Sequence, residues 1–404
     1  MSGLRAQRLA ARRAERRRAV RRKAMVVGAA AVAVVGTVTG MMTAFGGEPG
    51  TDEARPLVSG SPGLRLRSSV PTPDSPSPSR TSPPPSPSKS SAPSKKADVK
   101  PSAAKTEQRT EPVPDDSTRL YRHPDSQVLD WVRDNPDDPR SAVIESRIAD
   151  QPAAVWLTDP TPATVTSRVA AVASAGAAQD QVPVLVAYAI PDRDCGGASQ
   201  GGASSLDAYD TWIDAFAAGL GSDEVIVILE PDAIAQSDCL SADARADRLT
   251  SLARAGRVLK AANPKARVYY DAGHSEWNTP DKQATLLRLA GAASADSSDG
   301  VFSNVSNFNS TEAEVAYTRE VLDAVGGPET LGAVIDTSRN GNGAPVDGAW
   351  CDPDGRGLGW SPTLTTGEPR IDAYLWVKLP GESDGCRGRA GAFSPGYAYE
   401  LAKG

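Results

Sequence analysis

The sequence predicts an α/β fold in which seven parallel strands form a β/α barrel within residues 118–404. Short apolar runs alternate with Ala-rich helical stretches after Asp115, and this alternation is typical of a parallel sheet covered by helices. Runs such as Val225–Leu229 are apolar on both faces, which suits a strand inside a parallel barrel. Proline crowds between Pro71 and Pro114, so the earlier part of the chain has too little apolar content to bury a core.

Seven short, largely apolar runs supply the predicted strands. They are residues 153–157, 183–188, 225–230, 267–271, 301–304, 332–336 and 373–378. The helices expected between them include residues 164–178, 206–220, 241–262 and 312–325. Large α/β barrels run to about 250 residues as one unit, so a single domain accounts for the chain after its proline-rich part.

The first 117 residues divide into a head and a linker. Residues 1–23 carry ten basic side chains and one acidic one, and residues 25–45 are uncharged and rich in Ala, Val and Gly. We therefore expect residues 1–47 to be a cytoplasmic basic segment followed by a signal peptide or signal anchor. Residues 48–117 are rich in Pro, Ser and Thr and are expected to be a disordered linker.

Two interpretations of residues 25–45 are open. A secretory signal has a short apolar region and a cleavage site, whereas 21 uncharged residues are also enough to span a bilayer as an uncleaved anchor. In either case the basic residues upstream keep the N-terminus in the cytoplasm, so the remainder of the chain faces outward. The protein is therefore expected outside the cell, either secreted or tethered to the membrane.

The distribution of charge argues against one class of partner. The net charge of the chain is −6, but the residues after position 23 hold 34 basic and 49 acidic side chains and therefore carry −15. Because affinity for nucleic acid depends mostly on the neutralisation of phosphates by Lys and Arg, we expect no nucleic acid partner. A monomer is the default expectation for the oligomeric state.

Cysteine and histidine usage limits the chemistry. All four cysteines lie in the predicted domain, and an even count outside the cytosol usually forms disulfides, here with three possible connectivities. The two histidines, His123 and His274, supply too little for a zinc site or a Ser-His-Asp triad. We expect neither a metal nor a cofactor.

Polar residues follow the predicted strands at their C-terminal ends, where barrel enzymes gather their chemistry. In chain order they are Tyr188, Asp192, Asp194, Glu230, Asp232, Asp271, His274, Asn304, Asn307, Asp336, Arg339, Lys378, Glu382 and Asp384. Carboxylates held close together cannot all ionise at neutral pH, so some of them must have shifted pKa values. The pattern indicates general acid and base catalysis.

Tryptophans indicate the class of substrate. Trp156, Trp277 and Trp350 fall at or just beyond strand ends, where a flat apolar face can stack on a sugar ring. Three features together favour a glycosidase: carboxylates without a set of metal ligands, aromatic faces, and the expected location outside the cell. Two carboxylates suffice for that reaction.

Two segments resemble the signature motifs of glycoside hydrolase family 6, which contains endoglucanases and cellobiohydrolases. They are Val186-Ala-Tyr-Ala-Ile-Pro-Asp-Arg-Asp-Cys195 and Ile226-Val-Ile-Leu-Glu-Pro-Asp-Ala233. The likeness continues through residues 270–277, 335–343, 350–353 and 375–386, and it covers essentially all of residues 120–404. The resemblance implies a distorted seven-stranded β/α barrel, and residues 118–404 would then be a glycoside hydrolase catalytic domain.

The resemblance also implies roles. Asp232 would be the general acid, Asp194 would tune it, Asp384 is the candidate base, and Tyr188 would lie near the cleavage point. Substrate contacts are expected from Trp156, Asp271, His274, Trp277, Asn307, Trp350, Lys378 and Glu382. The implied disulfides join Cys195 to Cys239 and Cys351 to Cys386. A serine that helps hold water in many relatives corresponds here to Ser199 or Gln200.

The function expected from the sequence is an inverting endo-β-1,4-glucanase. Only about 30 residues separate Asp352 from Glu382, which favours an open cleft and attack in the middle of a glucan chain. Two alternatives are a cell-surface enzyme that trims glucan made by its own cell, and a carbohydrate-binding protein that has lost catalysis. The presence of Asp194, Asp232 and Asp384 argues against the latter.

Overall fold

The computed structural model describes residues 119–404. The predictions for the basic head, for residues 25–45 and for the linker therefore lie outside the described residues. Within residues 119–404, no helix combines the length and the apolar composition that crossing a membrane requires.

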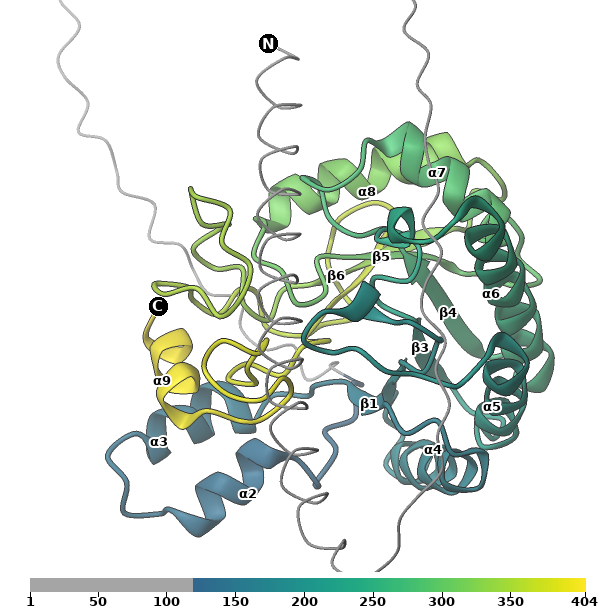
Figure 1. The fold of residues 1–404 in the computed structure, drawn as a ribbon. Helices are drawn as coiled ribbons and strands as arrows, with labels where there is room; N and C mark the ends of the chain where they lie inside the picture. Colours follow the sequence, from purple (N-terminus) through teal and green to yellow (C-terminus); the bar gives the residue numbers. More distant parts are fainter. Residues whose placement is uncertain (1–118) are drawn as a thin grey trace, which may run out of the picture. The chain divides into compact units, whose positions relative to one another are not determined.

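The seven strands form one parallel sheet in which their spatial order equals their order in the chain (Figure 1). They are β1 (Val155–Leu157), β2 (Val184–Ala187), β3 (Val225–Leu229), β4 (Ala266–Asp271), β5 (Gly300–Ser303), β6 (Gly332–Asp336) and β7 (Ile371–Leu375). Next to the two edge strands, the backbone N–H of Ala154 donates to the carbonyl of Trp376 at 3.0 Å. The curled sheet confirms the predicted distorted β/α barrel.

Five helices cover the outside of the sheet (Figure 1). They are α4 (Pro162–Ala177), α5 (Leu206–Ala218), α6 (Ala242–Ala262), α7 (Pro280–Leu289) and α8 (Thr311–Val325). The side chains of Ser205, Ser241, Thr279 and Ser310 each accept a hydrogen bond from the backbone N–H three residues on, which satisfies a donor that the first turn leaves unpaired. The four helices named from the sequence are confirmed to within two residues.

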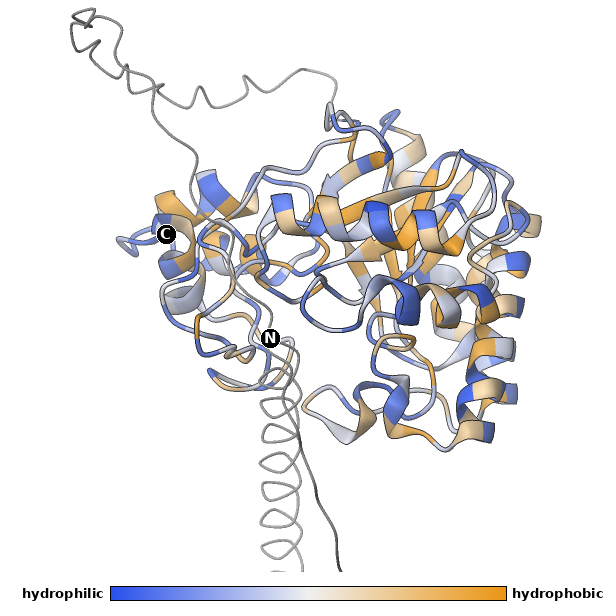
Figure 2. Ribbon diagram, turned by 90° about the horizontal axis from the view of Figure 1, so that it is seen from above, coloured by the Kyte–Doolittle hydropathy of each residue, from blue (hydrophilic) through white to orange (hydrophobic). Residues whose placement is uncertain are grey.

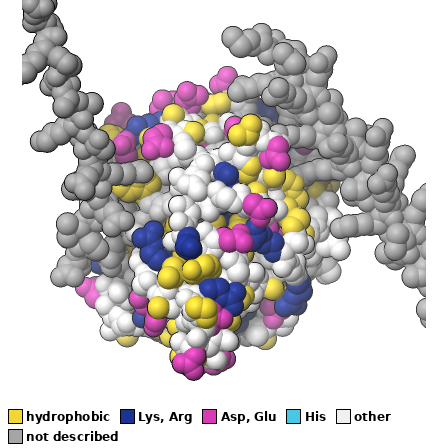
Figure 3. Space-filling model, turned by 90° about the vertical axis from the view of Figure 1, so that its left-hand side faces the viewer, with side chains coloured by type: hydrophobic (Ala, Val, Ile, Leu, Met, Phe, Trp, Pro, Cys, Tyr) yellow, Lys and Arg dark blue, Asp and Glu magenta, His cyan; other side chains and the backbone are white. Residues whose placement is uncertain are grey.

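Short helices from both ends of the described chain pack together beside the barrel (Figure 1). They are α2 (Gln127–Asp134), α3 (Ser141–Ile144), the π-helical turn η1 (Glu145–Ala149) and α9 (Pro395–Lys403). Their shared core contains Val128, Ile144, Ile148, Trp376 and Ala398. The face that these helices expose carries both basic and acidic side chains (Figure 3).

Alternate residues of the strands build two apolar layers, because successive side chains point to opposite faces of a sheet. Val186, Ile226 and Ile228 lie in the cluster inside the barrel, whereas Leu185 and Val227 pack against the helices. Figure 2 shows the apolar strands enclosed by helices with hydrophilic outer turns. This explains why β3 contains only apolar residues.

The last strand was predicted at residues 373–378 and lies at Ile371–Leu375. The apolar run continues past the strand because Trp376 packs in the cluster of short helices and Val377 packs inside the barrel. Lys378 therefore lies three residues beyond the strand, where its backbone N–H donates to the Asp336 carboxylate at 3.0 Å.

Candidate active site

The segments that follow β2 and β3 have an uncommon backbone conformation. Asp192, Asp194 and Cys195 have φ angles of 53°, 55° and 47°, and Glu230 and Asp232 have φ angles of 52° and 70°. Left-handed conformations are uncommon for residues with a side chain and gather at functional sites, where the surrounding structure must hold them. Two short helical turns, η2 (Asp194–Gly196) and η3 (Ser237–Cys239), belong to these segments.

Both disulfides join segments at strand ends. Cys195 is bonded to Cys239, and Cys351 is bonded to Cys386. This is the pairing that the resemblance implies. The first disulfide links the segment after β2 to the segment after β3, and the second links the long loop after β6 to the loop that contains Asp384.

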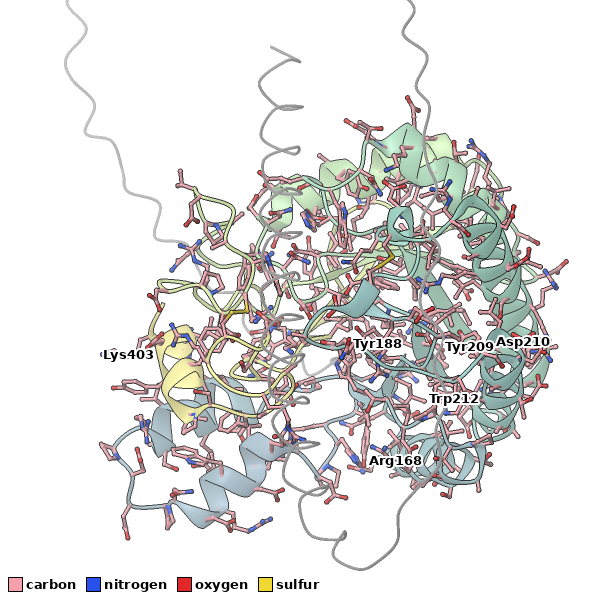
Figure 4. The ribbon with its side chains drawn as sticks, viewed as in Figure 1. Arg168, Tyr188, Tyr209, Asp210, Trp212 and Lys403 are labelled. Carbon is pink, nitrogen blue, oxygen red and sulfur yellow. A yellow bond between two sulfur atoms is a disulfide. The ribbon has the colours of Figure 1, made fainter. Side chains whose placement is uncertain are left out.

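Tyr188, Asp194 and Asp232 come together at the ends of β2 and β3. Burial raises the pKa of the Tyr188 hydroxyl above its usual range, and the negative charges of Asp232 and Asp194 raise it further. The ring of Trp156 meets the Tyr188 ring edge-on at 5.1 Å between centroids, and the Arg193 guanidinium lies 4.6 Å from the ring centre. Figure 4 shows Tyr188 near the middle of the barrel.

Asp194 organises its own loop. Its Oδ2 accepts a hydrogen bond from the backbone N–H of Ser199 at 2.8 Å, and Arg193 Nε donates to the Ser199 carbonyl at 3.0 Å. Of the two residues considered for the water-holding serine, Ser199 is thus the one that contacts Asp194, and it does so through its backbone.

Asp384 is buried among positive groups. Its Oδ2 accepts a hydrogen bond from Arg339 Nη1 at 2.9 Å, and its Oδ1 lies 3.6 Å from Lys378 Nζ. Arg339 is fully buried, and its second nitrogen donates to the Ser306 carbonyl at 2.6 Å. Two cations therefore stabilise the negative charge that Asp384 carries in this interior.

Asp352 holds the loop that contains Asp384. Its carboxylate accepts hydrogen bonds from the Asp384 N–H and the Ser383 hydroxyl, both at 2.6 Å, and from the Cys386 N–H at 2.9 Å. Asp352 was not among the predicted site residues, and Arg339 was named at a strand end without a role. The Cys351–Cys386 pairing was the available signal, because a disulfide between these loops brings Asp352 close to Asp384.

A polar network supports His274 at the ends of β4 and β5. Asn309 Nδ2 lies 2.8 Å from His274 Nδ1 and 3.2 Å from the buried carboxylate of Glu314, which also accepts the Ser275 N–H at 2.9 Å. Burial lowers the pKa of His274 to about 4, so its ring is neutral at ordinary pH. Trp277 lies 5.3 Å from the His274 ring, which places these two predicted substrate contacts side by side.

Three other predicted substrate contacts differ in exposure. Trp350 is 47% exposed, and Asn307 is half-buried with its side chain hydrogen-bonded to the Val305 carbonyl at 2.9 Å. Glu382 accepts a hydrogen bond from Gln127 Nε2 of α2 at 2.9 Å. Trp350 is one of the few large apolar side chains exposed among residues 119–404.

Asp271 ends β4 and is only 1% exposed. Its Oδ2 accepts hydrogen bonds from the N–H groups of Ile234 at 3.1 Å and Ala235 at 2.8 Å, and its Oδ1 accepts that of Gly273 at 2.8 Å. These contacts attach the turn that contains Asp232 to β4. The structure thus places Asp271 where it holds a neighbouring turn, and its contact with a substrate stays a prediction.

The pH dependence of stability tests the state of this carboxyl group. Burial raises the pKa of Asp271 to about 6, above the value of about 4 expected for the unfolded chain. Its contribution to stability is therefore fully present below pH 4 and is lost as the pH rises through 6. Relative to Asp271→Asn, the free energy of unfolding of the wild type should fall by about 2 kcal/mol between pH 4 and pH 7. Urea denaturation of both proteins measures this difference, and a pH-independent difference contradicts the expectation.

Within residues 119–404, no group of three or more His, Cys, Asp or Glu side chains is placed to hold a metal ion. The site consists of two parts. Tyr188, Asp194 and Asp232 lie at β2 and β3, and Lys378 and Asp384 lie beyond β7 with Arg339 from the end of β6.

Solved structures of other proteins share this fold. The endoglucanase Cel6 from Mycobacterium tuberculosis, solved in complex with methyl-cellobiosyl-4-deoxy-4-thio-β-D-cellobioside, matches with a TM-score of 0.64 and 40% sequence identity. The match covers 70% of this chain and 96% of that chain.

Similar protein sequences also include endoglucanases. Endoglucanase 1 of Streptomyces sp. (strain KSM-9) is 48% identical over 289 residues, which are 71% of this chain and 79% of the relative. Endoglucanase A of Thermobispora bispora is 48% identical over 284 residues, which are 70% of this chain and 61% of the relative. The family model named Glycosyl hydrolases family 6 matches residues 117–403. The chain therefore belongs to glycosyl hydrolase family 6, the family that its strand-end motifs resemble.

Proposed function

We propose that this glycoside hydrolase is an inverting endo-β-1,4-glucanase that cleaves cellulose or a related β-glucan. The observation that carries the proposal is the grouping of Asp232 and Asp194 around Tyr188, with a separate, ion-paired carboxylate at Asp384. Inverting glycosidases need an acid on one side of the scissile bond and a carboxylate that activates water on the other. The endoglucanases among the relatives support the choice of substrate.

Asp232 is the proposed general acid, which protonates the leaving glycosidic oxygen. A general acid must hold its proton at near-neutral pH, and a second carboxylate, Asp194, lies beside Tyr188 at the same strand ends. Tyr188 and Trp156 form an aromatic corner beside these carboxylates, and a sugar ring bound there is held against them. Trp277, Trp350 and His274 are proposed to bind further sugar units.

Asp384 is the proposed base. Its carboxylate forms ion pairs with Arg339 and Lys378, which fix its position in the site. We propose that a chain of water molecules carries the proton from the attacking water to Asp384. Lys378 and Glu382 complete this side of the site.

We also propose that the enzyme acts outside the cell. Two disulfides occur among residues 119–404, and disulfides persist mainly in oxidising compartments. The residues 25–45 proposed to direct export lie outside the described part of the chain. Fractionation of cells into medium, membrane and cytoplasm locates the protein, and recovery in the cytoplasm alone contradicts this proposal.

The function is tested with the purified full-length protein on carboxymethyl cellulose and on cellohexaose. An endo-acting enzyme should lower the viscosity of carboxymethyl cellulose early, before much reducing sugar appears. An inverting enzyme should release α-anomers from cellohexaose, which proton NMR detects within minutes. Slow loss of viscosity contradicts endo action, and β-anomers contradict inversion. Binding of cello-oligosaccharides without hydrolysis would instead indicate a carbohydrate-binding protein.

A further inference from the structure

Glu230 directly follows β3 and is fully buried, yet the proposed reaction gives it no task. Its carboxylate accepts the Ala189 N–H at 2.9 Å through Oε1 and 3.0 Å through Oε2, and the Ile190 N–H at 3.0 Å through Oε2. Ala189 and Ile190 come directly after Tyr188. The Glu230 carboxylate, which lies after β3, thus binds the backbone of the segment that follows β2.

The segment that contains Glu230 is itself in an unfavourable conformation. Glu230 and Asp232 both have positive φ angles, on either side of Pro231. Two backbone hydrogen bonds fix the turn: the Glu230 N–H donates to Ala187 at 2.9 Å, and the Ala233 N–H donates to Glu230 at 3.1 Å. Such a conformation persists only where neighbouring contacts impose it.

The other side of the Tyr188–Cys195 segment is also held by buried groups. Arg248 of α6 is 3% exposed and donates to the carbonyl of Pro191 at 2.6 Å. Gly202, with a φ angle of 103°, approaches Ile190 so closely that a Cβ atom would collide with the Ile190 carbonyl. The segment is therefore clamped, with Glu230 as the acceptor for its N–H groups and Arg248 as a donor to its carbonyls.

A carboxylate buried at this position costs free energy of desolvation. Burial raises the pKa of Glu230 to about 7, although the Ala189 and Ile190 N–H groups oppose the shift. The Tyr209 hydroxyl of α5 lies against the same carboxylate, and Figure 4 shows Tyr209 between α5 and the barrel. An apolar residue of similar volume would pack there without desolvating a charge, but it could not accept two backbone N–H groups.

We propose that Glu230 is a positioning residue, whose buried carboxylate sets the separation between the segment of Tyr188 and Asp194 and the turn of Asp232. The proposal rests on the proposed function and adds to it the group that aligns the acid with its partner. Displacement of a reacting group by about 1 Å can cost about 10² in rate, so a loosened clamp should lower kcat. Substrate contacts far from this clamp are unaffected, so KM should stay nearly constant.

The test compares the full-length wild type with Glu230→Gln on cellohexaose, at a temperature well below the Tm of both proteins. An amide keeps the shape of the side chain but turns a donor toward one of the two backbone N–H groups. We expect kcat to fall about 10-fold to 100-fold, with KM within about twofold of the wild type. A variant with unchanged kcat and a lowered Tm would show a merely structural role and overturn the proposal.

Two further variants make the result decisive. Asp372→Asn is the matched control, because Asp372 is a largely buried carboxyl group near the start of β7 that accepts the Tyr269 hydroxyl at 2.8 Å, and its variant should keep wild-type kcat. If Glu230→Gln does not fold, Glu230→Asp replaces it, since it keeps the charge and shortens the reach. Wild-type kcat in Glu230→Asp then overturns the proposal. An inactive wild type contradicts the proposed function instead.

Discussion

Replacing Asp232 by Asn should slow the hydrolysis of cellohexaose by about 10² to 10⁴-fold, the usual contribution of general acid catalysis. Asn keeps the shape of the side chain and tolerates the φ angle of 70° at this position, so the variant should fold with nearly the stability of the wild type. Steady-state kinetics on cellohexaose and thermal unfolding of both proteins measure these two quantities.

The leaving group provides the control for this prediction. In the 2,4-dinitrophenyl cellobioside the leaving group is dinitrophenolate, which departs without a proton. Hydrolysis of this substrate should therefore suffer much less from loss of the acid than hydrolysis of cellohexaose. Equal losses on both substrates would mean that Asp232 does something other than donate a proton. Retained activity on cellohexaose would remove Asp232 from the mechanism.

Replacing Arg339 by Ala should lower the free energy of unfolding by about 3 to 5 kcal/mol, because it leaves a buried charge without its closest partner. Arg339 is fully buried, binds the Asp384 carboxylate at 2.9 Å, and lies 4.4 Å from the centre of the Phe308 ring. Lys378, at 3.6 Å, is the remaining cation beside Asp384. Hydrolysis should also fall, because Asp384 is the proposed base.

An exposed ion pair offers the matched control. Arg254 binds Asp214 at 2.7 Å on the surface of α5 and α6, where both side chains are partly exposed. Exposed pairs contribute about 1 kcal/mol or less, so Arg254→Ala should be close to the wild type in urea denaturation. If Arg339→Ala costs no more than Arg254→Ala, Arg339 does not compensate the charge of Asp384.

The elements with strong local signals could be predicted from the sequence. The run Val225–Leu229 is apolar on both faces, and it proved to be a strand between the barrel interior and the helices. Ser241 marks the start of α6 because its hydroxyl caps the first turn. The last strand was displaced most, because the apolar residues after it belong to a second core.

The sequence pattern could not distinguish the roles of the carboxylates at the strand ends. Asp232, Glu230 and Asp271 all follow apolar runs, and a sequence pattern treats them alike. The structure shows that the oxygens of Glu230 and Asp271 accept hydrogen bonds from N–H groups of the adjoining segment. That outcome depends on left-handed φ angles and on neighbouring loops, neither of which hydrophobic periodicity encodes.

The cluster of short helices beside the barrel has a consequence for the order in which the chain folds. Each strand pairs with the next strand in the sequence, so the sheet can grow stepwise as the chain emerges. Val128, Ile144 and Ile148, however, find their apolar partners in Trp376 and Ala398, near the other terminus. We therefore expect the apolar faces of these early helices to be covered only after almost the whole chain has been made.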